Sequence, residues 1–278
     1  MKKILLIAGC SYSNDRFRSV HHPDLDVSWP KWPQLLAEKL DMQLINLSES
    51  GAGQEYIYSN IIDKLQTIDH SKIGLVMAAW STAPRRDYQT ESLYLKNKKW
   101  TYKNDMVQKI KWTNDMYDSK GCMYYWIDKS LRYYYSLQMV CENLKLPYKQ
   151  FQMVDLFKGY LWQELIRRRT KEWPEDHTKQ VPILNKASDL TVDEKHWKEK
   201  QEKKYLAQIH NSPYYEIINS NFIGWPTDVR LNGFSVADQA LEKDTDKGPS
   251  TDRISKLDLH PNRQGQRKLA RFIYDRLG

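Results

Sequence analysis

The fold of this chain is decided first by residues 3–11, which read KILLIAGCS. An unbroken apolar run such as Ile4 to Ala8 predicts a strand that is buried on both faces, as in a parallel sheet covered by helices on both sides. Ser11 follows just beyond the carboxyl end of this strand. Open α/β sheets bind their ligands at that edge, so the hydroxyl of Ser11 is a first candidate for chemistry.

Outward from this stretch, apolar strands alternate with amphipathic helices. Further strands are predicted at residues 43–46, 73–79 and 148–154. The helices between them are predicted at residues 33–40, at residues 57–65, and around residues 137–144. This alternation is typical of a parallel sheet between two helical layers. We therefore expect an α/β fold, a three-layer α/β/α sandwich of flavodoxin-like type with a central parallel sheet.

The strand and helix pattern is interrupted twice, so we expect a single domain over residues 1–278 with large insertions at about 84–127 and 157–250. Within the second insertion, Thr191 and Glu194 form a capping box that predicts a charged helix to about residue 208. Residues 242–252 are predicted to form a surface loop. Asn262 is predicted to cap a final helix, with an apolar face formed by Leu269, Ile273 and Leu277.

Composition narrows the possible partners. The chain has 278 residues, of which 40% are hydrophobic, and a net charge of +8, which indicates a globular protein. Lysines cluster between residues 96 and 111, but we expect a solvated face there, and no nucleic-acid recognition element accompanies them. The three cysteines are widely spaced and form neither a metal motif nor a disulfide framework. We therefore expect no cofactor, no metal and no nucleic-acid partner.

The N-terminal residues also resemble a lipoprotein signal ending at Cys10. A signal peptide needs an apolar core of roughly 7–15 residues, and the run here is short and leads directly into Ser11. No stretch approaches the roughly 20 apolar residues of a membrane span. The sequence therefore predicts a cytoplasmic protein with no membrane partner, and it leaves the oligomeric state open.

Three short segments carry groups that suit catalysis. Gly9-Cys10-Ser11 offers a hydroxyl, the loop from Asn46 to Gly53 offers backbone N–H groups at glycine positions, and Asp258-Leu259-His260 offers a carboxylate beside a base. Each segment alone is more often a turn, an ordinary loop or a structural pair. Taken together, their order along the whole chain points to a shared catalytic role.

In this order the segments resemble the blocks of the SGNH hydrolase superfamily, the GDSL-like esterases and lipases. The first block is matched by Gly9-Cys10-Ser11, the second by Asn46, Ser50 and Gly51, and the last by Asp258 and His260 before Pro261-Asn262. The run from Trp29 to Leu36 resembles the linker between the first two blocks. The likeness covers the first 80 residues and about the last 60, and it is closest to a divergent branch found in bacteriophage genomes.

The chain departs from the family pattern at three places. Cys10 replaces the aspartate of the first block. The third block, usually Gly-x-Asn-Asp, reads Ala79-Trp80-Ser81-Thr82 here, so Ser81 stands where the amide donor should be. The family aspartate lies three residues before the histidine, where this chain has Leu257. Asp258 lies two residues before His260, and residues two apart in an extended segment share a side.

The resemblance implies a serine esterase that forms an acyl-enzyme. Ser11 would be the nucleophile, His260 its base and Asp258 the acid that orients the histidine. The backbone N–H groups of Ser11 and Gly51 would bind the oxyanion, with the Ser81 hydroxyl as a third donor. Trp80, Arg85 and Arg86 follow as candidate substrate contacts, the two arginines as a clamp for an anionic group or as surface residues.

The expected substrate is a small acyl ester, and an O-acetyl group on a glycan is one candidate that rests on analogy of fold. Two alternatives stay open at this point. The same acyl-enzyme can pass its acyl group to an alcohol or amine in place of water, which would make the chain an acyltransferase. The altered third block also fits a non-catalytic SGNH-like module that binds a glycan or assembles with other proteins.

Overall fold

The computed structural model describes residues 2–85, 87, 122–170, 190–242 and 250–277. Its centre is a five-stranded sheet in the order β2-β1-β3-β4-β5, with every pair parallel. The strands are β1 (Ile4–Gly9), β2 (Gln43–Asn46), β3 (Ile73–Trp80), β4 (Tyr148–Gln152) and β5 (Phe222–Ile223). This is the strand order of flavodoxin-like folds, and it confirms the predicted fold class.

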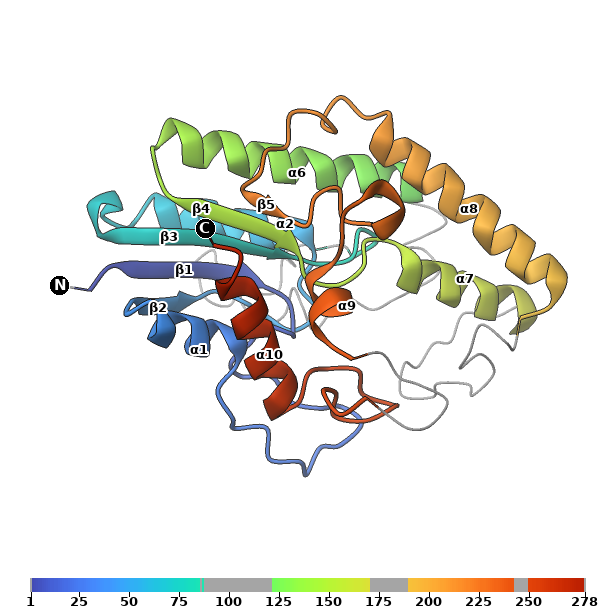
Figure 1. Ribbon diagram of the computed structural model, residues 1–278, viewed down its shortest axis with the longest axis horizontal. Coiled ribbons are helices and arrows are strands. Elements are labelled where there is room, and N and C mark those ends of the chain that lie inside the picture. The colour runs from blue at the N-terminus through green and yellow to red at the C-terminus, as the bar shows by residue number, and fades with distance from the viewer. Residues whose placement is uncertain (1, 86, 88–121, 171–189, 243–249, 278) are drawn as a thin grey trace, which may run out of the picture.

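Helices cover both faces of the sheet, as Figure 1 shows. The helices α1 (Trp32–Lys39), α9 (Val236–Ala240) and α10 (Arg263–Tyr274) pack on one face, where β1 contributes Leu5 and Ile7. On the other face, α2 (Gln54–Leu65) and α6 (Met123–Asn143) pack over Leu6 and Ala8. Alternate residues of β1 therefore enter two different cores, which is why the strand is apolar throughout.

The second insertion contains more regular structure than its sequence suggested. It contributes α7 (Lys158–Thr170), α8 (Val192–His210), the 3-10 turn Val229–Leu231 and the outer strand β5. A further 3-10 turn, His70–Lys72, precedes β3. The capping box of Thr191 and Glu194 is present at the start of α8. The sequence did not predict β5, because a two-residue strand is too short to show a period.

The predicted surface loop at residues 242–252 is wrong at its carboxyl end. Asp252 is fully buried, and its carboxylate accepts hydrogen bonds from the Lys268 ammonium group and the Glu242 N–H, both at 2.8 Å. The predicted cap of the last helix is confirmed, since Asn262 Oδ1 accepts from the N–H groups of Gln264 and Gly265. Residues 243–249 lie outside the described part of the chain.

Candidate active site

The fold brings the first and last blocks into direct contact. Ser11 lies in the turn after β1, closed by a hydrogen bond from the Ser13 N–H to the Cys10 carbonyl, and is 7% exposed. Ser11 Oγ lies 2.7 Å from His260 Nε2. His260 Nδ1 lies 2.6 Å from Asp258 Oδ1. Ser11, His260 and Asp258 thus form a continuous chain of hydrogen bonds, which is the arrangement that activates a serine hydroxyl.

Although Asp258 lies only two residues before His260, its carboxylate reaches the His260 ring. Asp258 Oδ1 accepts both from the ring at Nδ1 and from the His260 backbone N–H at 3.0 Å, so the side chain of Asp258 folds back on its own segment. Asn262, and not Asp258, caps α10. Asp252, the nearest other carboxylate upstream in the sequence, is fully buried and pairs with Lys268.

Several solved structures resemble the chain as a whole. A psychrotrophic esterase from Pseudoalteromonas sp., in a structure inhibited by monoethylphosphonate, is 13% identical, and the match covers 98% of this chain and 95% of that chain with a TM-score of 0.42. A lipase from a goat rumen metagenome is 12% identical over 99% of this chain and 97% of that chain, with a TM-score of 0.44. A candidate SGNH hydrolase from Slackia heliotrinireducens is 12% identical over the full length of both chains, with a TM-score of 0.39.

In structure the chain is similar to esterases and lipases of the SGNH and GDSL-like type. No family model matches its sequence, and no curated protein matches it. The bacteriophage branch remains a prediction.

The loop that carries His260 is fixed by the turn that carries Ser11. The Tyr12 hydroxyl donates to the Leu259 carbonyl at 2.9 Å, and Arg253 donates to the same carbonyl at 2.7 Å. Burial raises the pKa of Tyr12 to about 12, against the lowering effect of Arg253, so the phenol keeps the proton that it donates. The ring of Phe17 lies 4.3 Å from the His260 ring, centroid to centroid. These contacts hold the imidazole in place before any substrate arrives.

Trp32 links the turn that carries Ser11 to the last helix, α10. Its indole N–H donates to Ser13 Oγ at 3.1 Å, and its backbone N–H donates to Gln266 of α10 at 2.7 Å. The side chain is fully buried. The aromatic linker that the sequence singled out therefore serves as packing between the Ser11 turn and the last helix.

Ser19 is a site residue that sequence reasoning missed. It is 4% exposed, and its hydroxyl donates to Asp258 Oδ2, while it accepts from the His22 N–H at 3.0 Å. Burial alone would raise the pKa of Asp258, but the hydrogen bonds from His260 and Ser19 outweigh it and lower the pKa to about 2. The carboxylate is therefore charged at neutral pH. The stability that its charge contributes is lost only as the pH falls from about 4 towards 2.

We expect Ser19→Ala to slow ester turnover about 10-fold, because a hydrogen bond to a charged group contributes roughly 1.5–3 kcal/mol. The loss should lie in kcat, with KM changed less. Steady-state kinetics at neutral pH measure both. Ser28→Ala is the matched control, since Ser28 lies in the same loop but is exposed. Equal rates for both variants would remove Ser19 from the site.

The second block lies against the first. The Glu49 N–H donates to the Gly9 carbonyl at 3.1 Å, and the Asn46 amide donates to the Ser13 carbonyl at 2.8 Å. Gly51 has a φ of 81°, a left-handed conformation that glycine adopts without strain. Within the described part of the chain its N–H has no hydrogen-bond acceptor. The loop therefore offers a free donor beside the turn that carries Ser11.

The third block differs from what the sequence suggested. Ser81 is 0% exposed, so an oxygen atom of a substrate, which is about as large as a water molecule, does not reach its hydroxyl in this structure. Its N–H donates to Gln54, and its carbonyl accepts from the amides of Gln54 and Gln152. The hydroxyl accepts from Arg85 at 2.8 Å. The complete burial of Ser81 therefore contradicts the prediction that its hydroxyl donates directly to the oxyanion.

The three candidate substrate contacts, Trp80, Arg85 and Arg86, differ in where the structure places them. The structure contradicts the prediction that Trp80 contacts the substrate. Its side chain is fully buried in the core and donates to Gln150 at 3.0 Å, so it is not available to a ligand. Arg85 is partly exposed and lies between Ser81 and the second block. Arg86 lies outside the described residues, as does the lysine cluster at 96–111.

Asp87 anchors the second block from the other side. Its carboxylate accepts from the Gly53 N–H at 3.0 Å and from the Tyr56 N–H at 2.8 Å, at the start of α2. Burial raises the pKa of Asp87 to about 6, although the two N–H donors lower it. No local pattern links Asp87 to Tyr56 or Ser19 to Asp258, because these pairs are separated by 31 and 239 residues in sequence.

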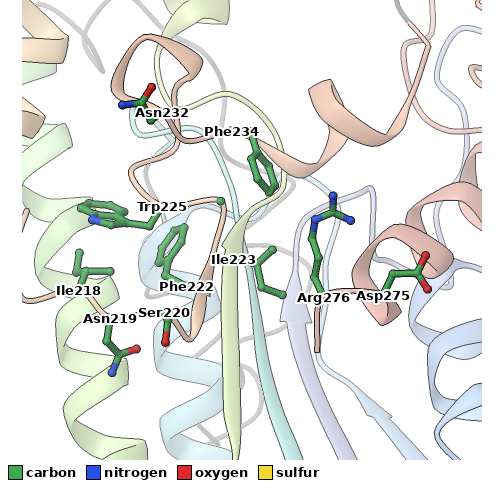
Figure 2. A pocket seen from close by; sticks show the side chains of 11 residues that line it. Ile218, Asn219, Ser220, Phe222, Ile223, Trp225, Asn232, Phe234, Asp275 and Arg276 are labelled. Carbon is green, nitrogen blue, oxygen red and sulfur yellow. The ribbon is translucent and has the colours of Figure 1, made fainter. Parts of the chain in front are cut away.

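A separate hollow of about 560 Å³ lies beside β5, the outer strand of the sheet, as Figure 2 shows. Phe222, Ile223 and Phe234 line it together with Arg276 from the end of the chain. None of its lining residues belongs to the first, second, third or last block. Among the described residues, no group of His, Cys, Asp or Glu side chains is arranged to hold a metal ion. The same residues contain no helix that is long and apolar enough to cross a bilayer.

Proposed function

We propose that this chain is a serine ester hydrolase that cleaves small acyl esters, with residues 1–278 forming one SGNH hydrolase-like domain. The observation that carries the proposal is the chain of hydrogen bonds from Ser11 Oγ through His260 to Asp258 Oδ1, with distances of 2.7 and 2.6 Å. A hydroxyl joined to a base that is joined to a carboxylate is the geometry of a serine nucleophile.

The chemistry follows from the positions of these atoms. Ser11 Oγ attacks the ester carbonyl carbon while its proton passes to His260 Nε2. The tetrahedral oxyanion receives hydrogen bonds from the N–H groups of Ser11 and Gly51. The C–O bond to the leaving alcohol then breaks, and the alcohol takes the proton from His260. Water, activated by the same histidine, hydrolyses the acyl-enzyme and releases the carboxylic acid. Asp258 stabilises the charged imidazolium in both halves of the reaction.

The substrate class that we propose is a short acyl group on an alcohol, with an O-acetylated glycan as the natural form. Support comes from the aromatic ring of Tyr12, which is partly exposed and lies beside the His260 ring. Aromatic side chains with polar tips suit contact with sugars.

The test uses 4-nitrophenyl acetate, butyrate and octanoate, together with an O-acetylated polysaccharide. We expect the highest kcat/KM with the acetate, and release of free acetate from the polysaccharide. No turnover of any of these esters, with Ser11 unreactive, would favour the binding module. If an added alcohol instead captures the acyl group ahead of water, the chain is an acyltransferase.

A further inference from the structure

The guanidinium group of Arg85 connects Ser81 of the third block to the second block. Arg85 Nη1 donates to Ser81 Oγ at 2.8 Å and to the Ala52 carbonyl at 3.1 Å. Ala52 stands between Gly51 and Gly53 in the second block. Arg85 therefore ties the end of β3 to the glycine loop that offers the Gly51 N–H.

The register of the sheet places this guanidinium near the nucleophile. Gly9 of β1 pairs with Ala79 of β3. Neighbouring strands are about 5 Å apart. Ser11 and Ser81 each follow their paired residue by two positions, at the same edge of the sheet. The side chain that lies on Ser81 is thus close to the turn of Ser11, at the place where the resemblance predicts a third donor.

Arg85 also has donors to spare. Its Nε is buried and out of reach of a ligand, but its Nη2 has no hydrogen-bond partner among the described residues and is not buried. No carboxylate of the described residues lies within ion-pair distance of its guanidinium, whereas Arg16, Arg169 and Arg230 each pair with one. Asp87 is close enough to feel its charge, but both Asp87 oxygens already accept backbone N–H groups. The N–H groups of Nη2 are therefore free to donate to a ligand oxygen that reaches the guanidinium.

We propose that the guanidinium of Arg85 is the third donor to the oxyanion, in place of the amide that the third block lacks, and that Ser81 positions it. This inference rests on the proposed ester hydrolysis. When the Ser11 Oγ–carbon bond forms, the carbonyl electron pair moves to the oxygen, and a guanidinium N–H stabilises the resulting charge together with the Ser11 and Gly51 N–H groups. A cation there interacts more strongly with the oxyanion than with the neutral ester, so it lowers the barrier more than it aids binding.

The test compares Arg85→Ala, Arg85→Gln and Arg85→Lys with the wild type on 4-nitrophenyl acetate. We expect Arg85→Ala and Arg85→Gln to lose about 100- to 1,000-fold in kcat, the usual effect of removing one oxyanion donor, with KM changed less than about 3-fold. Millimolar guanidinium ion should restore part of the rate to Arg85→Ala. Arg271→Gln is the matched control, since that side chain is 82% exposed on α10 and should leave kcat unchanged.

Rates are expressed per site that a fluorophosphonate labels at completion, so misfolded protein does not enter the comparison. The inference is overturned if the wild type is active and Arg85→Ala keeps its kcat within about 3-fold, or if only KM rises, which would make Arg85 a clamp on the substrate. If the wild type neither turns over nor is labelled, the proposed hydrolysis itself fails. The Arg85→Lys variant, which keeps the charge but not the fork of donors, should fall between the wild type and Arg85→Ala.

Discussion

Replacing Ser11 with alanine should lower the hydrolysis of 4-nitrophenyl acetate by about 10⁴- to 10⁶-fold, the loss seen when a serine nucleophile is removed. The substitution deletes one hydroxyl, whose hydrogen bond is to His260. The fold should therefore persist, and circular dichroism should show a cooperative melt close to that of the wild type.

Covalent labelling gives the same prediction a direct readout. A fluorophosphonate should add one phosphonyl group to the wild type, and peptide mass spectrometry should find it on Ser11. Ser11→Ala should not react. Ser13→Ala is the matched control, because Ser13 lies two residues further on and its hydroxyl accepts from the Trp32 indole, whereas the Ser11 hydroxyl donates to a base. Labelling that persists in Ser11→Ala, or wild-type protein that never reacts, would contradict the nucleophile assignment.

Asp258→Asn should lower kcat by about 10³- to 10⁴-fold while the protein stays folded at the assay temperature. Asp258 Oδ1 accepts two N–H groups of His260, and Oδ2 accepts the Ser19 hydroxyl. An amide nitrogen turned towards the ring would favour the wrong tautomer of His260. An amide oxygen in that place would keep the tautomer but lack the negative charge that stabilises the imidazolium.

Asp252→Asn provides the contrast for this prediction. Asp252 is fully buried and binds Lys268 and the Glu242 N–H, with no contact to His260. Its variant should lower the melting temperature, because a buried carboxylate loses the charge that pairs with Lys268, and it should keep kcat per labelled site near the wild-type value. Steady-state kinetics and thermal melts on both variants separate the two roles. Normal turnover by Asp258→Asn would leave Ser11 and His260 as a dyad.

The sequence by itself determined the layers of the fold and the two ends of the site. Residues 3–11 could be read because a strand buried on both faces leaves no room for polar residues, and the same local logic located β3. The strands β2 and β4 carry polar residues and were located from the alternation of strands and helices. Asp258 and His260 could be linked from sequence because they are two residues apart, and Ser11 because it follows a strand whose carboxyl end must lie at the ligand edge.

Only the tertiary structure decided what surrounds these residues. Ser19 reaches Asp258 across 239 positions of sequence, and Arg85 reaches Ala52 across 33. No local pattern records such contacts, because loop residues meet only after the sheet has fixed where their loops begin. Burial is likewise a property of the assembled layers. It removed Trp80 and the hydroxyl of Ser81 from direct contact with a ligand, and it left the side chain of Arg85 partly exposed. Only the packed neighbours determine which polar groups a substrate can reach.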